Sequence, residues 1–132
     1  MYSYATLGTN DLKASKRFFD ATLGAIGVTC FYEGDDAIAY AKTGTERPSL
    51  WVTKPFDSGT ANFGNGAMLC YEASSAEQVN AFYAGALANG GADEGAPGYR
   101  EHYSPDFYAC YVRDPLGNKM AVVFRDPARA AK

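Results

Sequence analysis

Apolar and polar residues follow one another along the chain in two cycles of the same kind. Residues 2–9 form a short β-rich run, after which apolar residues recur at helical spacing over 12–26. Asn10 and Asp11 precede the helical stretch, where a side-chain oxygen can accept a bond from a free N–H of the first turn. Three more short strand-like runs follow, at residues 28–32, 37–41 and 50–53. The first cycle therefore predicts a strand, a helix and three strands.

The second cycle starts at residue 67. Residues 67–72 are strand-like, and Ser74 with Glu77 matches a capping box, in which the Glu side chain returns a bond to the Ser amide. A helical face follows, and Gly90-Gly91 ends the helix. The next stretch, to Asp106, is polar and predicted to be irregular. A hairpin then closes the chain, with a Pro- and Gly-containing turn at 114–118.

The two helical faces align without gaps. The shift is 64 residues, since 82 − 18 and 87 − 23 both give 64, and it superimposes Phe18, Phe19 and Leu23 on Phe82, Tyr83 and Leu87. We therefore predict one α+β domain, 1–132, made of two βαβββ modules at about 1–54 and 67–126, joined by a polar Gly-containing linker. A ferredoxin-like sandwich is the alternative, but it leaves the run at 50–53 without a place.

Composition excludes several functional classes. Net charge is −3 and the basic residues are dispersed, which argues against a nucleic-acid partner. No apolar run approaches the roughly 18–20 residues that span a membrane, and the N-terminus lacks the pattern of a signal peptide. Three cysteines without an export signal predict reduced thiols. We expect a cytoplasmic protein that does not bind membranes.

Four sequence motifs, in this order, resemble those of one superfamily. They lie at residues 7–19, 63–66, 90–100 and 113–118, the last reading Arg-Asp-Pro-Leu-Gly-Asn. The chain resembles the vicinal-oxygen-chelate superfamily, which includes glyoxalase I, extradiol dioxygenases, and bleomycin and fosfomycin resistance proteins. The resemblance implies that the modules form a curved mixed sheet, a cup with helices on the outside. It also implies a homodimer, and it leaves open whether one chain or two supply the modules of each cup.

In this superfamily His and Glu residues hold a divalent metal at the bottom of the cup. Matched residue by residue, the first-strand ligands fall on Tyr4 and Met68, and the last-strand ligands on Trp51 and Ala121. A tyrosine coordinates only as phenolate, a thioether is soft, and Trp and Ala offer no donor that suits such a metal. We therefore expect no metal and no cofactor.

The replacements suggest a different use of the cup. Tyr4, Trp51 and Met68 would line it, Ala121 would leave space, and Cys70 shares the strand face of Met68. Such an apolar, aromatic lining suits a flat organic ligand. The alternative is that these side chains fill the cup and are simply core.

The segment that leads into the final hairpin contains the one histidine of the chain. Arg100 and His102 lie there among tyrosines, and a histidine in this setting could act as a general base or help to clamp an anion. It could equally lie in solvent on a surface connection.

Three functional readings follow. The leading hypothesis is a metal-free member of the superfamily that binds a small aromatic or amphipathic molecule at Tyr4, Trp51, Met68, Cys70, Arg100, His102 and Ala121. The second is a glyoxalase-like lyase or dioxygenase-type enzyme with an atypical site, for which Tyr4 and His102 are the catalytic candidates. The third is a structural or regulatory dimer with a filled cup.

Overall fold

The computed structural model describes residues 1–129 and contains two modules of one strand, one helix and three strands. The first consists of β1 (Ala5–Gly8), α1 (Leu12–Gly24), β2 (Val28–Glu33), β3 (Ala37–Lys42) and β4 (Leu50–Thr53). The second consists of β5 (Leu69–Glu72), α2 (Ala76–Ala88), β6 (Ala92–Tyr99), β7 (Phe107–Arg113) and β8 (Lys119–Arg125), followed by a 3-10 turn at Pro127–Arg129. The predicted α+β fold of two βαβββ modules is confirmed.

Each module forms its own four-stranded mixed sheet, with strand order β1-β4-β3-β2 in the first and β5-β8-β7-β6 in the second. In each sheet the first strand runs parallel to the last, and the other pairs are antiparallel. Among the described residues no hydrogen-bonded strand pair joins the two sheets, so β1 and β5 are both edge strands.

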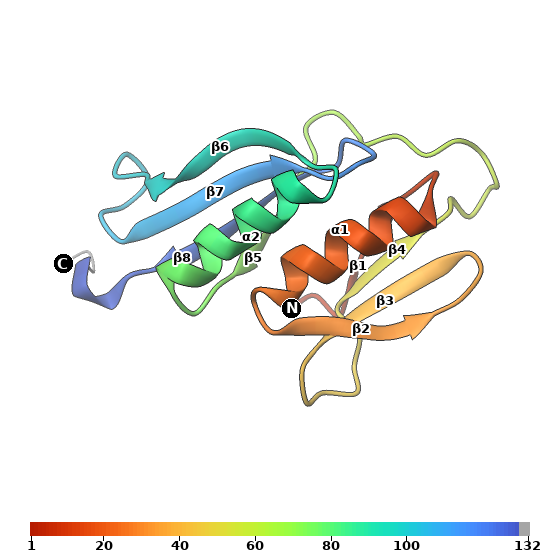
Figure 1. The fold of residues 1–132 in the computed structure, drawn as a ribbon, viewed down its shortest axis with the longest axis horizontal. Coiled ribbons are helices and arrows are strands. Elements are labelled where there is room, and N and C mark those ends of the chain that lie inside the picture. The colour runs from red at the N-terminus through yellow and green to blue at the C-terminus, as the bar shows by residue number, and fades with distance from the viewer. Residues whose placement is uncertain (130–132) are drawn as a thin grey trace.

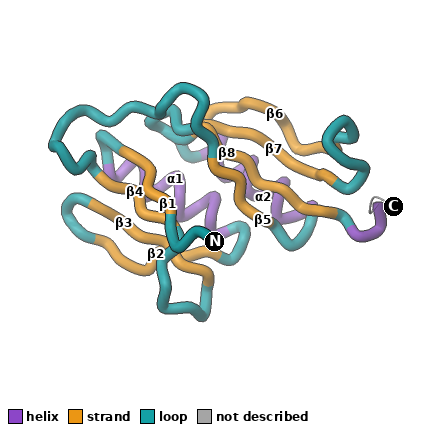
Figure 2. The backbone as a smooth tube through the Cα atoms, turned by 180° about the vertical axis from the view of Figure 1, so that it is seen from behind, coloured by secondary structure: helices purple, strands orange, loops and turns teal. Residues whose placement is uncertain are grey.

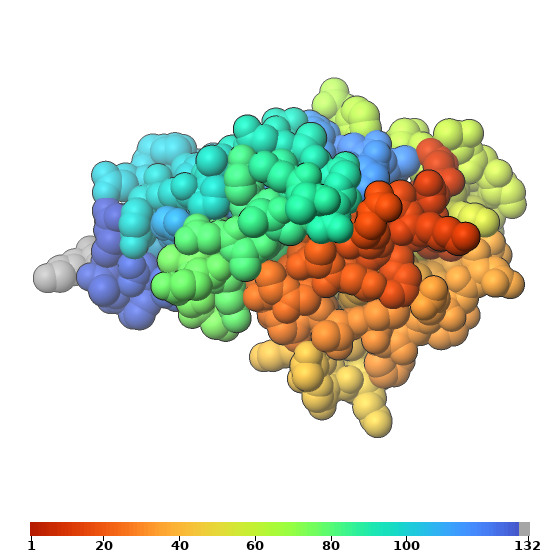
Figure 3. Space-filling model, in the orientation of Figure 1, coloured from red at the N-terminus to blue at the C-terminus, as the bar shows by residue number. Residues whose placement is uncertain are grey.

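Both helices lie on the same side of the sheets. Figure 1 shows α1 and α2 side by side in front of the strands, and Figure 2 shows the sheets from behind with β1 and β5 near the middle. The space-filling view shows atoms of the two helices in direct contact (Figure 3). Within residues 1–129 no helix is long and apolar enough to cross a membrane.

One hydrophobic core is shared by the two modules. Phe18 of α1 and Phe82 of α2 are both fully buried and belong to the same cluster, together with apolar side chains from β3, β4, β7 and β8. The helix positions that the periodicity assigned to a buried face include both of these phenylalanines. The modules therefore pack as one body rather than as two separate cores.

The turn at residues 114–118 connects the modules with hydrogen bonds. Asp114 Oδ1 accepts bonds from the backbone N–H groups of Leu116, Gly117 and Asn118. The Asn118 side-chain amide donates both to Asp114 Oδ2, at 2.9 Å, and to the carbonyl oxygen of Gly8 in β1, at 3.1 Å. The Asp and Asn of this motif thus hold the second module to the edge strand of the first.

Three local predictions need correction. The cap of α2 is Ser75, which accepts from Gln78 N, while Gln78 Oε1 accepts from the Ser74 amide; the capping box is shifted by one residue from Ser74 and Glu77. The stretch predicted to be irregular contains β6, whose register is interrupted twice, which explains its weak strand pattern. Helix α1 ends at Gly24, before the predicted end at 26.

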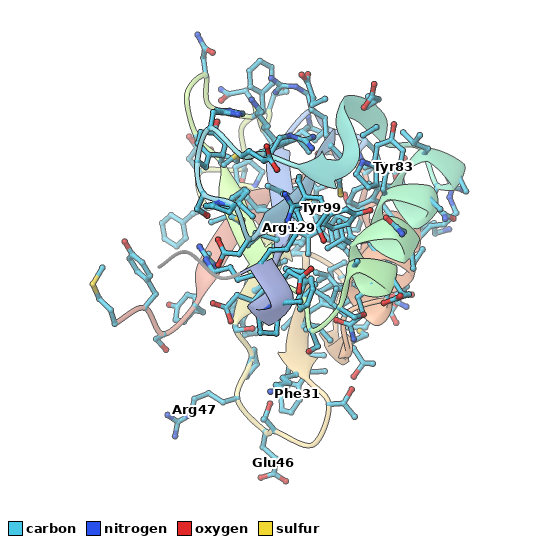
Figure 4. The ribbon with its side chains drawn as sticks, turned by 90° about the vertical axis from the view of Figure 1, so that its left-hand side faces the viewer. Phe31, Glu46, Arg47, Tyr83, Tyr99 and Arg129 are labelled. Atoms are coloured by element: carbon cyan, nitrogen blue, oxygen red, sulfur yellow. The ribbon has the colours of Figure 1, made fainter. Side chains whose placement is uncertain are left out.

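The end of β6 is fixed by the C-terminal turn (Figure 4). The guanidinium carbon of Arg129 lies 3.7 Å from the centroid of the Tyr99 ring, and the Tyr99 hydroxyl donates to Asp126 Oδ2 at 2.7 Å. Cation–π contact and a charge-assisted hydrogen bond hold this tyrosine from two sides. These contacts therefore also fix the position of the backbone at the next residue, Arg100.

Replacement of Gly91 by Ala should destabilise the protein. A methyl group there would lie 2.6 Å from Phe18 Cε2 and under 3.0 Å from the carbonyl oxygens of Ala86 and Arg113, and backbone atoms cannot move aside easily. We expect a loss of about 1–3 kcal/mol or more in the free energy of unfolding, measured by urea denaturation.

Gly24→Ala is the matched control, because nothing lies within 4 Å of the added methyl group at the end of α1. It should leave stability unchanged or raise it by up to about 1 kcal/mol. Equal stability of the two variants would contradict the close packing between the modules at Gly91.

Candidate functional site

The face of each sheet that the helices do not cover is called the open face here. In the first module Thr6, Trp51 and Ala39 are directly paired across β1, β4 and β3, so they share the open face. Trp51 is half-buried, and its ring lies 5.8 Å from that of Tyr32. In the second module the equivalent row is Cys70, Ala121, Tyr111 and Gly95.

A cavity of about 750 Å³ opens between the modules, beside the two edge strands. Tyr4 and Met68 each lie one residue before an edge strand, with exposed fractions of 58% and 46%, and both line this cavity. Cys70 lines it as well, and Ile26 and Leu50 contribute apolar atoms from the first module. The structure thus brings together three of the predicted site residues, Tyr4, Met68 and Cys70.

The other predicted residues lie outside the lining of this cavity. Trp51 and Ala121 are on the open face, but neither is among the lining residues. Ala121 is only 1% exposed, and its row neighbours Cys70 and Tyr111 carry longer side chains on the same face. The expected open space above Ala121 is therefore absent in the single chain, because residues flanking a small side chain on a pleated sheet can cover it.

Arg100 and His102 point to different surroundings. The Arg100 guanidinium donates to the carbonyl oxygens of Ala96 and Gly98, at 2.7 and 2.8 Å, and lies 5.5 Å from the centroid of the Tyr111 ring. His102 is exposed, and its ring lies 4.2 Å from that of Tyr103. Arg100 therefore belongs to the open face, and His102 belongs to the surface loop between β6 and β7.

Comparison with solved structures gives close matches. A glyoxalase/bleomycin resistance protein from Albidiferax ferrireducens T118 is 37% identical to this chain, with a TM-score of 0.83; the match covers 95% of this chain and 98% of that one.

The chain belongs to the glyoxalase/bleomycin resistance protein family. Two further structures share its fold: a glyoxalase-related enzyme from Fulvimarina pelagi, at 19% identity over 94% of this chain and 87% of that one, with a TM-score of 0.73; and a glyoxalase/bleomycin resistance protein/dioxygenase family enzyme from Burkholderia phytofirmans PsJN, at 17% identity over 93% and 97%, with a TM-score of 0.69. No protein-family model and no curated protein matches the sequence.

The metal-ligand positions of this glyoxalase-like fold can be compared through strand register. Thr6 pairs with Trp51 and Cys70 pairs with Ala121, and 70 − 6 is again 64, so Trp51 and Ala121 occupy equivalent points of the two modules. Neither side chain carries a metal donor. In residues 1–129 no group of three or more His, Cys, Asp or Glu side chains lies close enough together to hold a metal ion. The residues present therefore do not fit the divalent metal that the resemblance implies.

Burial is the largest cause of the pKa shifts of the thiols in this protein. Partial burial raises the pKa of the Cys70 thiol, Arg125 lowers it, and Glu72 raises it, with a net upward shift. Burial likewise raises the pKa of the fully covered Cys110 thiol to about 12. Since the thiolate is the nucleophile, Cys70 contributes a neutral, polarizable sulfur to the cavity at neutral pH.

Two open-face residues were not singled out from the sequence. Tyr111 pairs with Ala121, and Lys119 lies two residues before Ala121 on the same strand face. Alternation along the closing hairpin was enough to place both beside the predicted site. The sequence does not show that the Arg100 guanidinium lies over Tyr111, because Arg100 follows β6 and no strand alternation indicates where its side chain points.

Cys70 should react slowly with iodoacetamide in the folded protein. Its raised pKa means that less thiolate is present at pH 7–8 than for an ordinary thiol, so the rate should continue to rise above pH 9. The experiment uses Cys30→Ser, which removes the other exposed thiol, and mass spectrometry of the labelled peptide.

The same protein unfolded in urea serves as the control and should react faster at pH 7.5. A folded-state rate that levels off below pH 8 would show that Cys70 has the opposite shift.

Proposed function

We propose that this glyoxalase/bleomycin resistance family protein binds a small aromatic or amphipathic molecule without the family's metal. The observation that carries the proposal is the cavity of about 750 Å³ between the edge strands. Its volume falls within the range of roughly 300–1,000 Å³ typical of small-molecule sites. Tyr4 and Met68 line it with large, exposed side chains, which in a binding site become buried when the ligand arrives.

The chemistry of the lining favours a flat, apolar ligand body. Tyrosine supplies an aromatic face with one hydroxyl, and Met68 and Cys70 supply polarizable sulfur atoms that pack well against rings. Charged side chains, Lys42 and Glu72, are also among the lining residues. A ligand with an apolar body and a polar end matches this combination.

The arrangement favours binding over the proposed acid–base chemistry. The enzyme alternative requires Tyr4 and His102 to act on one substrate, but Tyr4 lines the cavity and His102 does not. His102 is exposed in the loop between β6 and β7, with its ring tilted against that of Tyr103. We therefore put forward the binding function as the primary one.

Binding can be tested with the neutral fluorescent probe N-phenyl-1-naphthylamine. We expect saturable binding, followed by the rise in the fluorescence of the probe itself, that weakens about tenfold or more in the double variant Tyr4→Ala, Met68→Ala. The reason is that each lost side chain removes apolar contact worth about 1.5 kcal/mol or more. Both side chains are exposed, so the melting temperature should change little.

Phe56→Ala is the matched control, because Phe56 is a fully exposed aromatic residue that lies outside the proposed site. It should bind the probe as the parent does. An absence of saturable binding, or equal affinity in the double variant and the parent, would refute the proposed function.

Metal analysis gives an independent test. With Tyr4, Met68, Trp51 and Ala121 at the matched positions, the purified protein should contain far less than one equivalent of zinc, nickel, manganese or iron per chain. Treatment with EDTA should leave its melting temperature unchanged. One tightly bound transition metal per chain, by elemental analysis, would contradict the metal-free proposal.

A further inference from the structure

Two cations without a carboxylate partner are partly buried on the open face of the second module. Among residues 1–129, six lysines and arginines lie farther than 4.0 Å from every described carboxylate: Lys13, Arg17, Lys42, Arg47, Arg100 and Lys119. The first four are exposed, and only Arg100 and Lys119 are half-buried. Because a charge loses hydration when it is buried, unpaired cations normally remain exposed.

Arg100 is held in place before any ligand arrives. Its guanidinium donates to Ala96 O and Gly98 O, which uses two of its five N–H groups. Methyl groups at Gly95 and Gly98 would lie 3.1 and 3.2 Å from its two terminal nitrogens, so these glycines provide the space that the guanidinium occupies. Gly95 pairs with Tyr111, which places the guanidinium at the end of the row that contains Ala121.

Lys119 approaches the same aromatic ring and also the seam between the modules. Its ammonium nitrogen lies 6.0 Å from the centroid of the Tyr111 ring, and the guanidinium carbon of Arg100 lies 5.5 Å from the same centroid. Lys119 also lines a small cavity of about 160 Å³ together with Met68 and Thr6. Met68 lines the larger cavity too, so Lys119 lies next to the proposed binding site.

Two carboxylates of the second module, Glu94 and Glu72, pair with other arginines. Glu94 Oε1 lies 2.7 Å from Arg113 Nε, and Glu72, whose side chain is 88% exposed, lies 4.0 Å from Arg125. The half-buried positive charge of Arg100 and Lys119 therefore has no counter-ion within the described chain, and the ring of Tyr111 compensates for only part of it.

We propose that Arg100 and Lys119 recognise the carboxylate of a small aromatic acid whose apolar body lies against Tyr4 and Met68. The inference rests on the proposed function, because it assigns a class of ligand to that site. A carboxylate can accept hydrogen bonds from free N–H groups of Arg100 and from the ammonium group of Lys119, and such charge-assisted bonds are about twice as strong as neutral ones. Cationic ligands are disfavoured at the same place.

A pair of nearly isosteric probes, naphthalene-2-carboxylate and naphthalene-2-carboxamide, tests this by isothermal titration calorimetry. At low ionic strength we expect the carboxylate to bind about tenfold more tightly or better. In Lys119→Gln and in Arg100→Gln this preference should fall to about threefold or less, while the affinity for the carboxamide is kept. Added NaCl should weaken the binding of the carboxylate probe and leave that of the carboxamide probe unchanged.

Lys13→Gln is the control, since it removes the same charge from an exposed position on α1 and should keep the preference. Only variants that keep the melting temperature of the parent are compared. One folded variant of either cation is enough to test the anion site. If both probes bind equally in the parent, or if the preference survives in the cation variants, the anion site is refuted and the proposed function stands. If neither probe binds, both proposals fail.

Discussion

Packing of α1 against α2 is the contact on which the rest of this structure depends. It buries Phe18 of one module and Phe82 of the other in a single cluster. Because each sheet needs only one covered face, the shared helix layer satisfies both modules from the same side. The opposite faces are left open and point in the same direction (Figures 1 and 2). The cavity lies between the modules, and Leu23 of α1 lines it together with Tyr4 and Met68.

The cavity persists because the two edge strands do not pair with each other. β1 and β5 end their sheets on either side of the gap, and the modules are instead joined at one end, where the Asn118 amide donates to Gly8 O. A hydrogen bond at the end of the strands fixes their separation without closing the space beside them. Tyr4 and Met68, which precede the two strands, both line the cavity beside them.

The open face differs from a metal centre in its chemistry. Trp51 and Ala121, at equivalent register positions, provide no donor atoms, whereas Arg100 and Lys119 bring positive charge to the side chain of Tyr111. In a metal site the ion supplies the charge that polarises an oxygen ligand. Here two protein cations lie near the Tyr111 ring instead, and they form the anion site that we propose.

The sequence by itself determined the paired modules and most of their elements, because hydrophobic periodicity depends only on neighbours along the chain. The resemblance to the superfamily, matched residue by residue, placed Tyr4, Met68 and Ala121 where that family has metal ligands. The sequence pattern misplaced the cap of α2 by one residue and missed β6, whose bulges break the two-residue alternation. Only the tertiary structure decided that Ala121 is covered and that the Arg100 guanidinium lies over Tyr111. Both depend on contacts between strands, which local pattern does not encode.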